Sequence, residues 1–234
     1  MERVFVDANI LYSRTIRDWL FALSTSKIQM FDLFSSEDVF AEVVYHYRRS
    51  NPKRSGDEVN GLVNQIRELV HVVDHYDCER AQADYMGADP NDLHLHAAAV
   101  DNDCSVLLTN DRKLYASLDE SQLDGLPYSV CTADDFFCDL AESSAVLLDQ
   151  AVTCELQYWS KNVPTEFPIL PTVIDPCRMP TFAYLVKRAL MRKSGLSPVD
   201  ISKQFPLGEE YSSTMREYDI DALASISDDF YPGV

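Results

Sequence analysis

Asp7 and Asn9 are the first residues of the chain whose types and positions suggest chemistry. They follow an apolar run at residues 4–6, which has the composition of a buried strand, and they precede an apolar pair at residues 10–11. An unpaired charge costs several kcal/mol when it is buried, so Asp7 must meet a cation, a set of hydrogen-bond donors or solvent. The sequence therefore predicts a compensated carboxylate at the end of the first strand.

Three more acids stand at positions that a parallel sheet would bring near Asp7. Asp111 ends an apolar run, Asp92 falls in the first turn of a predicted helix, and Glu42 lies mid-helix on the flank of an apolar stripe. Ligands of open parallel sheets bind at the carboxyl ends of the strands, so these acids are expected to converge on that edge. Oxygen ligands of high charge density suit Mg²⁺ or Mn²⁺ rather than zinc or copper. The hypothesis is a divalent cation held by four carboxylates: Asp7, Glu42, Asp92 and Asp111.

Each acid also has an ordinary structural interpretation. An aspartate at the end of a strand often serves a turn or caps a helix, and Asp111 follows Asn110 in that manner. Asp92 near a helix N-terminus is favoured by the helix dipole whatever its function. Glu42 on a helix flank would usually be solvated. The order of the four acids along the elements favours a site over four separate structural roles.

The elements that must position these acids alternate between strands and helices. Strands are predicted at residues 3–7, 71–76, 104–111 and 127–132, and helices from about residue 13, after residues 35–38, through residues 59–69, after residues 89–92 and after residue 132. Ser35 and Asp38 have the spacing of a capping box, and Thr132 with Asp135 could cap the helix that follows. This alternation predicts an α/β domain with a mainly parallel sheet.

The strand signals stop after about residue 140. Helical periodicity continues to about residue 160, and a segment with five prolines follows at residues 163–180. A basic amphipathic helix is predicted at residues 181–193, then a short helix opened by Ser197 and Pro198, and then an acidic, frayed tail. We therefore predict an α/β domain over residues 1–140 and a helical extension over residues 141–234.

Composition indicates an ordinary globular chain. Of the 234 residues, 46% are hydrophobic and 25% are charged, and no apolar run is long enough to span a membrane. The N-terminus does not have the pattern of a secretory signal. Six cysteines are scattered without a metal-binding spacing, as expected for reduced thiols. These features predict a cytoplasmic protein.

The formal net charge of −18 argues, taken alone, against a nucleic-acid partner, because phosphates are normally bound by Lys and Arg. The basic residues nevertheless concentrate in two segments, residues 48–54 and 187–193. Solvated helix faces would explain either segment. An acidic background could also confine a polyanion to those segments or attract a basic protein. Charge therefore leaves the class of partner open.

Four motifs together resemble one family. VFVDANILYS, the helix that contains Glu42, DPNDLHLHAAAV and VLLTNDRKL resemble the PIN domain of VapC-like toxins, in the larger subgroup with a D-x-H-x-x-A-A-A motif and a helical C-terminal extension. The similarity covers residues 3–140 well and is weaker over residues 141–193. The resemblance implies a PIN-like, mainly parallel sheet flanked by helices. It also implies a metal-dependent endoribonuclease, usually the toxin of a type II toxin–antitoxin pair neutralised by a cognate antitoxin.

The resemblance also implies roles for residues of the site. The four acids would be the ligands of Mg²⁺ or Mn²⁺, and polar support would come from three residues: Asn9, His94 and Thr109. Two departures stand out. His96 replaces a residue that is usually apolar in the subgroup, and Asp111 lies in TND where relatives often have T-x-N.

In this chemistry, one or two metal ions lower the pKa of a bound water, whose hydroxide attacks the phosphate in line and leaves 5′-phosphate and 3′-hydroxyl ends. Four basic residues are candidates for binding the RNA backbone: Arg48, Arg49, Arg112 and Lys113. Ordinary surface charge is the alternative for each of them.

Other classes stay open at the level of sequence. A phosphoacceptor receiver domain would need an acidic pair before the acceptor and a late strand-end lysine, and neither is present. A PIN nuclease for RNA processing or DNA flaps, without an antitoxin, and a non-catalytic PIN-shaped binding module are the remaining alternatives. A homodimer is compatible with all of them. A neighbouring small gene for a DNA-binding protein would favour the toxin.

Overall fold

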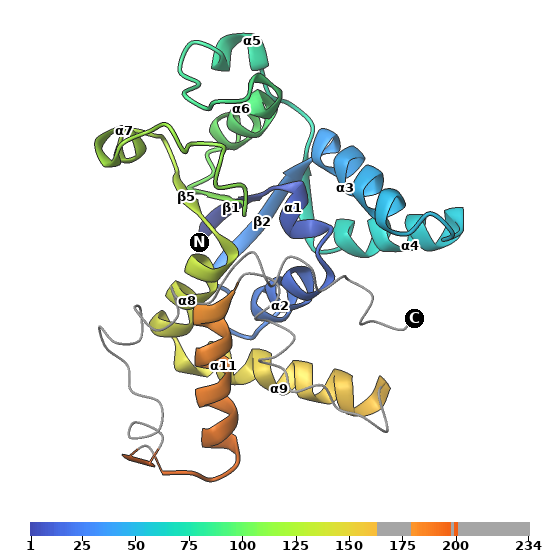
Figure 1. Ribbon diagram of the computed structural model, residues 1–234, viewed down its shortest axis with the longest axis vertical. Helices are drawn as coiled ribbons and strands as arrows, with labels where there is room; N and C mark the ends of the chain where they lie inside the picture. The colour runs from blue at the N-terminus through green and yellow to red at the C-terminus, as the bar shows by residue number, and fades with distance from the viewer. Residues whose placement is uncertain (163–178, 198, 201–234) are drawn as a thin grey trace. The chain divides into compact units, whose positions relative to one another are not determined.

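The computed structural model describes residues 1–162, 179–197 and 199–200, and within them five parallel strands form a sheet in the order β3-β2-β1-β4-β5. Three of the strands, β1, β2 and β5, are labelled in Figure 1. The strands are β1 (Glu2–Val6), β2 (Phe31–Ser36), β3 (Val70–Val73), β4 (Val106–Leu108) and β5 (Ser129–Cys131). All four pairings are parallel. The strand order reverses direction between β1 and β4, which is where parallel sheets bind ligands. The predicted α/β fold with a parallel sheet is confirmed.

Helices connect and flank the strands. They are α1 (Ala8–Leu11), α2 (Arg14–Ser24), α3 (Glu37–Ser50), α4 (Gly56–Arg67), α5 (Cys78–Ala81), the 3₁₀ helix η1 (Pro90–Asp92), α6 (Leu93–Asp101), α7 (Glu120–Asp124), α8 (Ala133–Ser143), α9 (Ala145–Asn162) and α11 (Pro180–Lys193). None of the described helices is long and apolar enough to cross a membrane.

The chain divides into two compact units, Met1–Phe136 and Phe137–Val234. The second unit contains α9 and α11, which contact each other and are joined by an ion pair of 3.0 Å between Arg192 and Asp149. These two helices match the periodicity expected up to residue 160 and at residues 181–193. The proline-rich segment, most of the short helix after Ser197 and the acidic tail lie outside the described residues. The division into a nuclease domain and an extension at residue 140 stays a prediction.

The centre of the sheet explains why Asp7 stands where it does. Residues 4–6 of β1 are fully buried, and residues 106–108 of β4 are also buried. A central parallel strand is covered by helices on both faces, so its sequence is continuously apolar. The first residue after such a strand lies at the carboxyl edge of the sheet, and after β1 that residue is Asp7.

Three local predictions were wrong. The strand β2 was not predicted at all, and the cap of α3 is Ser36, whose hydroxyl accepts from the Val39 amide at 3.3 Å, rather than Ser35. Ser35 belongs to β2, and its hydroxyl donates to the Val6 carbonyl at 2.9 Å. Of the strand predicted at residues 104–111, only residues 106–108 form a strand, β4. Asp111 therefore lies three residues beyond the end of β4.

His96, the unusual residue of α6, lies in a buried polar network. Its side chain is 1% exposed, and Nδ1 lies 2.7 Å from the Tyr128 hydroxyl, which lies 2.6 Å from the hydroxyl of Tyr115. Burial lowers the pKa of His96, because a charged imidazole is poorly solvated there. The network ties α6 to the residue that precedes β5, so His96 replaces an apolar contact by a hydrogen bond.

The lowered pKa of His96 predicts a loss of stability in mild acid. The unfolded chain binds a proton at His96 near pH 6.5 and the folded chain does so only at lower pH, so the free energy of unfolding falls as the pH drops below about 6.5. Urea unfolding at pH 7.5 and 5.5 should therefore show a larger acid-induced loss for the wild type than for His96→Asn.

The comparison of variants is needed because raised pKa values of carboxyl groups act in the opposite direction over the same pH range. His71→Asn is the matched control, because His71 is exposed on β3. It controls for the replacement of a histidine by asparagine as such. An identical pH dependence for the wild type and His96→Asn would contradict the prediction.

Candidate active site at the carboxyl edge of the sheet

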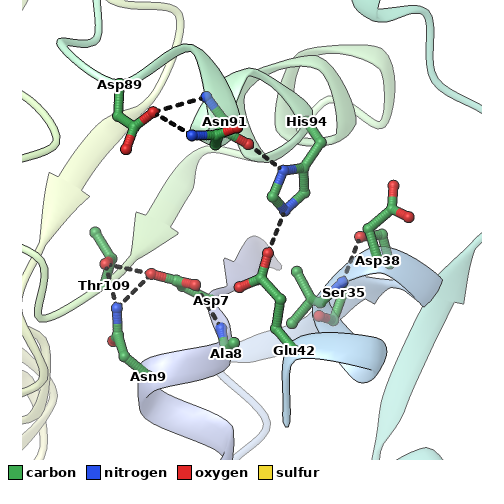
Figure 2. A network of polar contacts seen from close by, with 12 residues as sticks. Asp7, Ala8, Asn9, Ser35, Asp38, Glu42, Asp89, Asn91, His94 and Thr109 are labelled. Carbon is green, nitrogen blue, oxygen red and sulfur yellow. Dashed lines mark hydrogen bonds and ion pairs between the residues drawn. The ribbon is translucent and has the colours of Figure 1, made fainter. Parts of the chain in front are cut away.

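Asp7 is the N-cap of α1 and the centre of a dense set of polar contacts (Figure 2). Its carboxylate accepts hydrogen bonds from the Ala8 backbone amide, from the Asn9 side-chain amide and, at 2.6 Å, from the Thr109 hydroxyl. The residue is only 6% exposed. Hydrogen-bond donors are therefore one means by which this structure compensates the buried charge.

The contacts around Asp7 join the ends of β1 and β4. The Asn9 side-chain nitrogen Nδ2 donates to the Thr109 hydroxyl at 2.9 Å, and the side-chain oxygen Oδ1 of Asn9 accepts from the Asn110 backbone amide at 2.9 Å. The Asn110 side chain in turn accepts from the Ala133 backbone at 2.9 Å, at the start of α8. Asn110 had not been singled out from the sequence, although an amide between Thr109 and Asp111 at the end of a strand was a usable signal.

The donors offset only part of the cost of burying Asp7. Burial raises the pKa of its carboxyl group, and the hydrogen bonds from Thr109 and Ala8 lower it less than burial raises it. The nearby Glu42 charge raises the pKa further, and His94 lowers it. The site therefore holds an anion that an additional positive charge would stabilise.

Glu42 of α3 and His94 of α6 face each other across the edge, as Figure 2 shows. The His94 Nε2 atom lies 3.5 Å from a Glu42 carboxylate oxygen. Nδ1 lies 2.8 Å from the Asn91 carbonyl oxygen, which can only accept, so Nδ1 carries a hydrogen. Nε2 is buried and has no hydrogen-bond partner among the described residues. In a neutral imidazole its lone pair would face the carboxylate, an arrangement that a proton or a cation between them would stabilise.

Asp92, the last residue of η1, has a pKa that nearby acids raise. Its pKa is raised to about 6, first by partial burial and then by the charges of Asp89, Asp7 and Asp111, while His94 lowers it. The structure therefore brings Asp92 within electrostatic reach of Asp7 and Asp111.

Asp89 is a second acid beside Asp92 that had not been selected from the sequence. Its carboxylate caps η1 by accepting from the Asn91 backbone at 2.9 Å and from the Asn91 side chain at 2.8 Å. An aspartate followed by proline at the first helical position is a known start signal, which identifies its capping role. Its charge nevertheless contributes to the raised pKa of Asp92.

Asp111 is the most exposed of the candidate ligands that follow a strand. Its backbone amide donates to the Thr109 hydroxyl at 3.0 Å, and its carboxylate accepts from the Lys113 backbone at 2.8 Å. This pattern is that of a side chain that stabilises a turn. Asp111 thus combines a local structural contact with a charge that contributes to the raised pKa of Asp92.

This difference predicts a ranking of the acids. Asp111→Asn should reduce cleavage less than Asp7→Asn, because an exposed outer carboxylate can act through water and an amide can partly replace it. Single-turnover rates at saturating Mg²⁺ measure the two losses. Equal losses would show that Asp111 is as directly involved as Asp7.

The four predicted RNA-binding residues lie in two places. Arg112 and Lys113 are exposed and follow Asp111 directly. Arg49 is exposed in the last turn of α3, and the half-buried Arg48 donates to the Arg54 carbonyl at 2.5 Å. Arg49 is seven residues from Glu42, which is about 10 Å along the helix.

The donor types at this edge fit a hard divalent cation. Carboxylate oxygens predominate, the charges of Asp89, Asp7 and Asp111 raise the pKa of Asp92, and the buried Nε2 of His94 has no hydrogen-bond partner among the described residues. In the described part of the chain, however, no three His, Cys, Asp or Glu side chains are grouped closely enough to hold a metal ion as they stand. Rotations of the side chains of Glu42 and Asp92, neither of which is fully buried, would be needed to surround the ion.

Comparison with known proteins adds one positive finding. No curated protein matches the chain. The family model of the PIN domain matches residues 4–118. That stretch includes most of β1, all of β2, β3 and β4, and the four acids. The part of the chain that holds the candidate site is therefore similar to a PIN domain, a fold that is generally that of a nuclease.

Proposed function

We propose that the protein is a divalent-metal-dependent endoribonuclease that hydrolyses RNA phosphodiester bonds. The observation that carries the proposal is the pKa of Asp92 at the carboxyl edge, which is raised to about 6 first by partial burial and then by the charges of Asp89, Asp7 and Asp111. Perturbed carboxyl groups that gather at a ligand-binding edge are typical of functional sites. The similarity of residues 4–118 to a PIN domain supports hydrolysis of a nucleic acid.

In this proposal the four acids Asp7, Glu42, Asp92 and Asp111 bind Mg²⁺ or Mn²⁺. The bound metal would supply an activated water and stabilise charge on the phosphate. The chain's other residues prepare the acids. Asn9 and Thr109 orient the Asp7 carboxylate through their hydrogen bonds, and His94 faces the Glu42 carboxylate.

We further propose that the protein is the toxin of a type II pair and that its antitoxin covers the carboxyl edge. A net charge of −18 and a cluster of acids suit a basic inhibitory segment, which electrostatic attraction would guide to the site. An arginine of the antitoxin could pair with the acids in place of the metal. Antitoxin binding should therefore weaken in salt and compete with Mg²⁺.

The first test is cleavage of a labelled RNA with Mg²⁺, with Mn²⁺ and with EDTA. We expect products with 5′-phosphate and 3′-hydroxyl ends with either metal and none in EDTA. Undiminished cleavage in EDTA would refute the metal-dependent mechanism. Binding of RNA without cleavage under all conditions would instead indicate a non-catalytic binding module.

The second test separates a toxin from a nuclease that acts in RNA processing or on DNA flaps. Expression of the wild type should arrest growth, Asp7→Asn should be harmless, and co-expression of a neighbouring small gene should restore growth. A wild type that is harmless at high expression, yet cleaves RNA in vitro, would favour the processing nuclease.

A further inference from the structure

One face of α3 carries aromatic rings that the catalytic proposal does not use. Tyr45 and His46 lie three and four residues after Glu42, so the three side chains share that face. The His46 ring stacks on the Tyr12 ring, with centroids 5.0 Å apart and planes at 22°, and meets the Tyr45 ring edge-on at 5.3 Å. We call these three rings, Tyr12, His46 and Tyr45, the α3 platform.

The platform is continuous with the candidate active site. Tyr12 is the C-cap of α1, the helix that Asp7 caps at its other end, and α1 packs on α3 (Figure 1). Glu42 begins the same stripe of α3, which continues past the rings to Arg49. From Glu42 to Arg49 the stripe covers about 10 Å along the helix axis. That length accommodates about three stacked nucleotides at 3.4 Å each.

The exposure and charge of this stripe favour a nucleic acid over a buried structural role. Tyr45 is 61% exposed, although Val39, Phe40 and Val43 on the opposite side of α3 are buried. Arg49 is exposed beyond the rings, and the exposed Lys53 follows the helix. Neither of these two basic residues forms an ion pair with a described carboxylate. Rings for stacking next to free positive charge are how proteins bind unpaired strands.

We propose that the α3 platform is a base-stacking subsite beside the candidate active site, in which an unpaired base of the RNA stacks on the exposed ring of Tyr45 while the half-buried, stacked rings of Tyr12 and His46 support it. In a duplex the faces of the bases are covered by their neighbours, so the rings of Tyr12, His46 and Tyr45 could not reach them. Arg49 binds the phosphate of a stacked nucleotide, and the strand continues along the stripe towards Glu42. This assignment deepens the proposed function and rests on it.

The test measures binding separately from cleavage. Fluorescence anisotropy with the Asp7→Asn protein in EDTA follows a labelled, unstructured RNA of twelve nucleotides and a hairpin whose stem has the same sequence. The Kd for the unstructured RNA should be lower than that for the stem. Tyr45→Ala should raise the Kd for the unstructured RNA about fivefold or more, since each stacked base contributes substantially to binding. Tyr45→Phe keeps the ring and should bind like the parent protein.

Salt dependence distinguishes the roles of the ring and the charge. Arg49→Ala should reduce the slope of log K against log salt concentration by about 0.7, the value for one phosphate contact on a single strand. Tyr45→Ala should leave that slope unchanged while weakening binding at every salt concentration. Tyr158→Ala is the matched control, because Tyr158 of α9 is also partly exposed, at 38%, and lies in the other unit. Its Kd should equal that of the parent protein.

Several results would overturn the inference. An unchanged Kd of Tyr45→Ala for the unstructured RNA would do so, as would equally tight binding of the hairpin stem by the parent protein. A Tyr45→Ala protein that binds a protein inhibitor more weakly but binds RNA as before would also do so. The two proposals fail separately. A wild type that binds unpaired RNA through Tyr45 but cleaves none would refute the nuclease alone. A nuclease whose KM for unstructured RNA is insensitive to Tyr45→Ala would refute the platform alone.

Discussion

Replacing Asp7 by asparagine should reduce RNA cleavage by at least about 10²–10³-fold, the usual cost of removing a group that acts directly on the reacting charge. The same substitution should leave the thermal stability of the protein unchanged or raise it. Burial raises the pKa of the Asp7 carboxyl, which means that the folded protein carries an anion at a cost. An amide occupies nearly the same volume without that charge. Cleavage rates and thermal unfolding of the same preparation measure both effects.

The combination of the two results is what identifies a functional residue. A purely structural Asp7 would lose stability and activity together, because its hydrogen bonds with Ala8, Asn9 and Thr109 would be weakened. Asp32→Asn is the matched control, since Asp32 pairs with Arg3 in the register of β2 and β1, away from the carboxyl ends of both strands. It should cleave like the wild type. Full activity of Asp7→Asn would refute the proposed site.

Asp92→Asn should stabilise the metal-free protein at pH 7 and remove its response to Mg²⁺. The pKa of Asp92 is about 6 in the folded protein against 3.8 for an unperturbed aspartate. Protonation therefore favours the folded state, and the contribution of Asp92 to stability increases as the pH falls from about 6 towards 3.8. Since Asp92 is only partly buried, we expect the asparagine to add about 1 kcal/mol to the free energy of unfolding at pH 7.

Mg²⁺ should raise the free energy of unfolding of the wild type much more than that of Asp92→Asn. At a concentration one hundred times its Kd, an ion that binds only the folded wild type adds about 2.7 kcal/mol to the free energy of unfolding. Asp92→Asn should gain much less. Urea unfolding at pH 7 with Mg²⁺, and with NaCl of equal ionic strength, separates specific binding from screening. If NaCl reproduces the Mg²⁺ effect, or if the variant responds like the wild type, Asp92 is not a ligand.

Much of the fold follows from local patterns in the sequence. The apolar runs of β1 and β4 are continuous because helices cover both faces of a parallel sheet, so their positions are evident without a structure. The strand β2 was missed because it ends in Ser35 and Ser36, two residues with the composition of a helix cap. In the structure both serines are fully buried, and Ser35 is satisfied by the Val6 carbonyl. Only the neighbouring strand explains why a serine is tolerated there.

The candidate site was less accessible from the sequence than the fold. The acid types and their order predicted a common edge, and the pKa of Asp92 is raised first by partial burial and then by the charges of Asp89, Asp7 and Asp111. The hydrogen bond of Asn9 with Thr109 joins residues 100 positions apart, and no local pattern specifies such a pair. The orientation of His94 depends likewise on the Asn91 carbonyl and on a helix, α3, that is distant along the chain.

The bond between the Thr109 hydroxyl and Asp7 also has a consequence for protein synthesis. β1 can pair with β2 once residue 36 has been made, but its pairing with β4 must wait for residues 106–108. Until residue 109 emerges from the ribosome, the Asp7 carboxylate lacks its hydroxyl donor, and Asp111 is not yet outside the ribosome either. Domains fold as units during translation, and contacts of large sequence separation form late. A ribosome that stalls before this point therefore carries a nascent chain without an assembled cluster of acids, and the proposed active site can form only after residue 111 has left the ribosome.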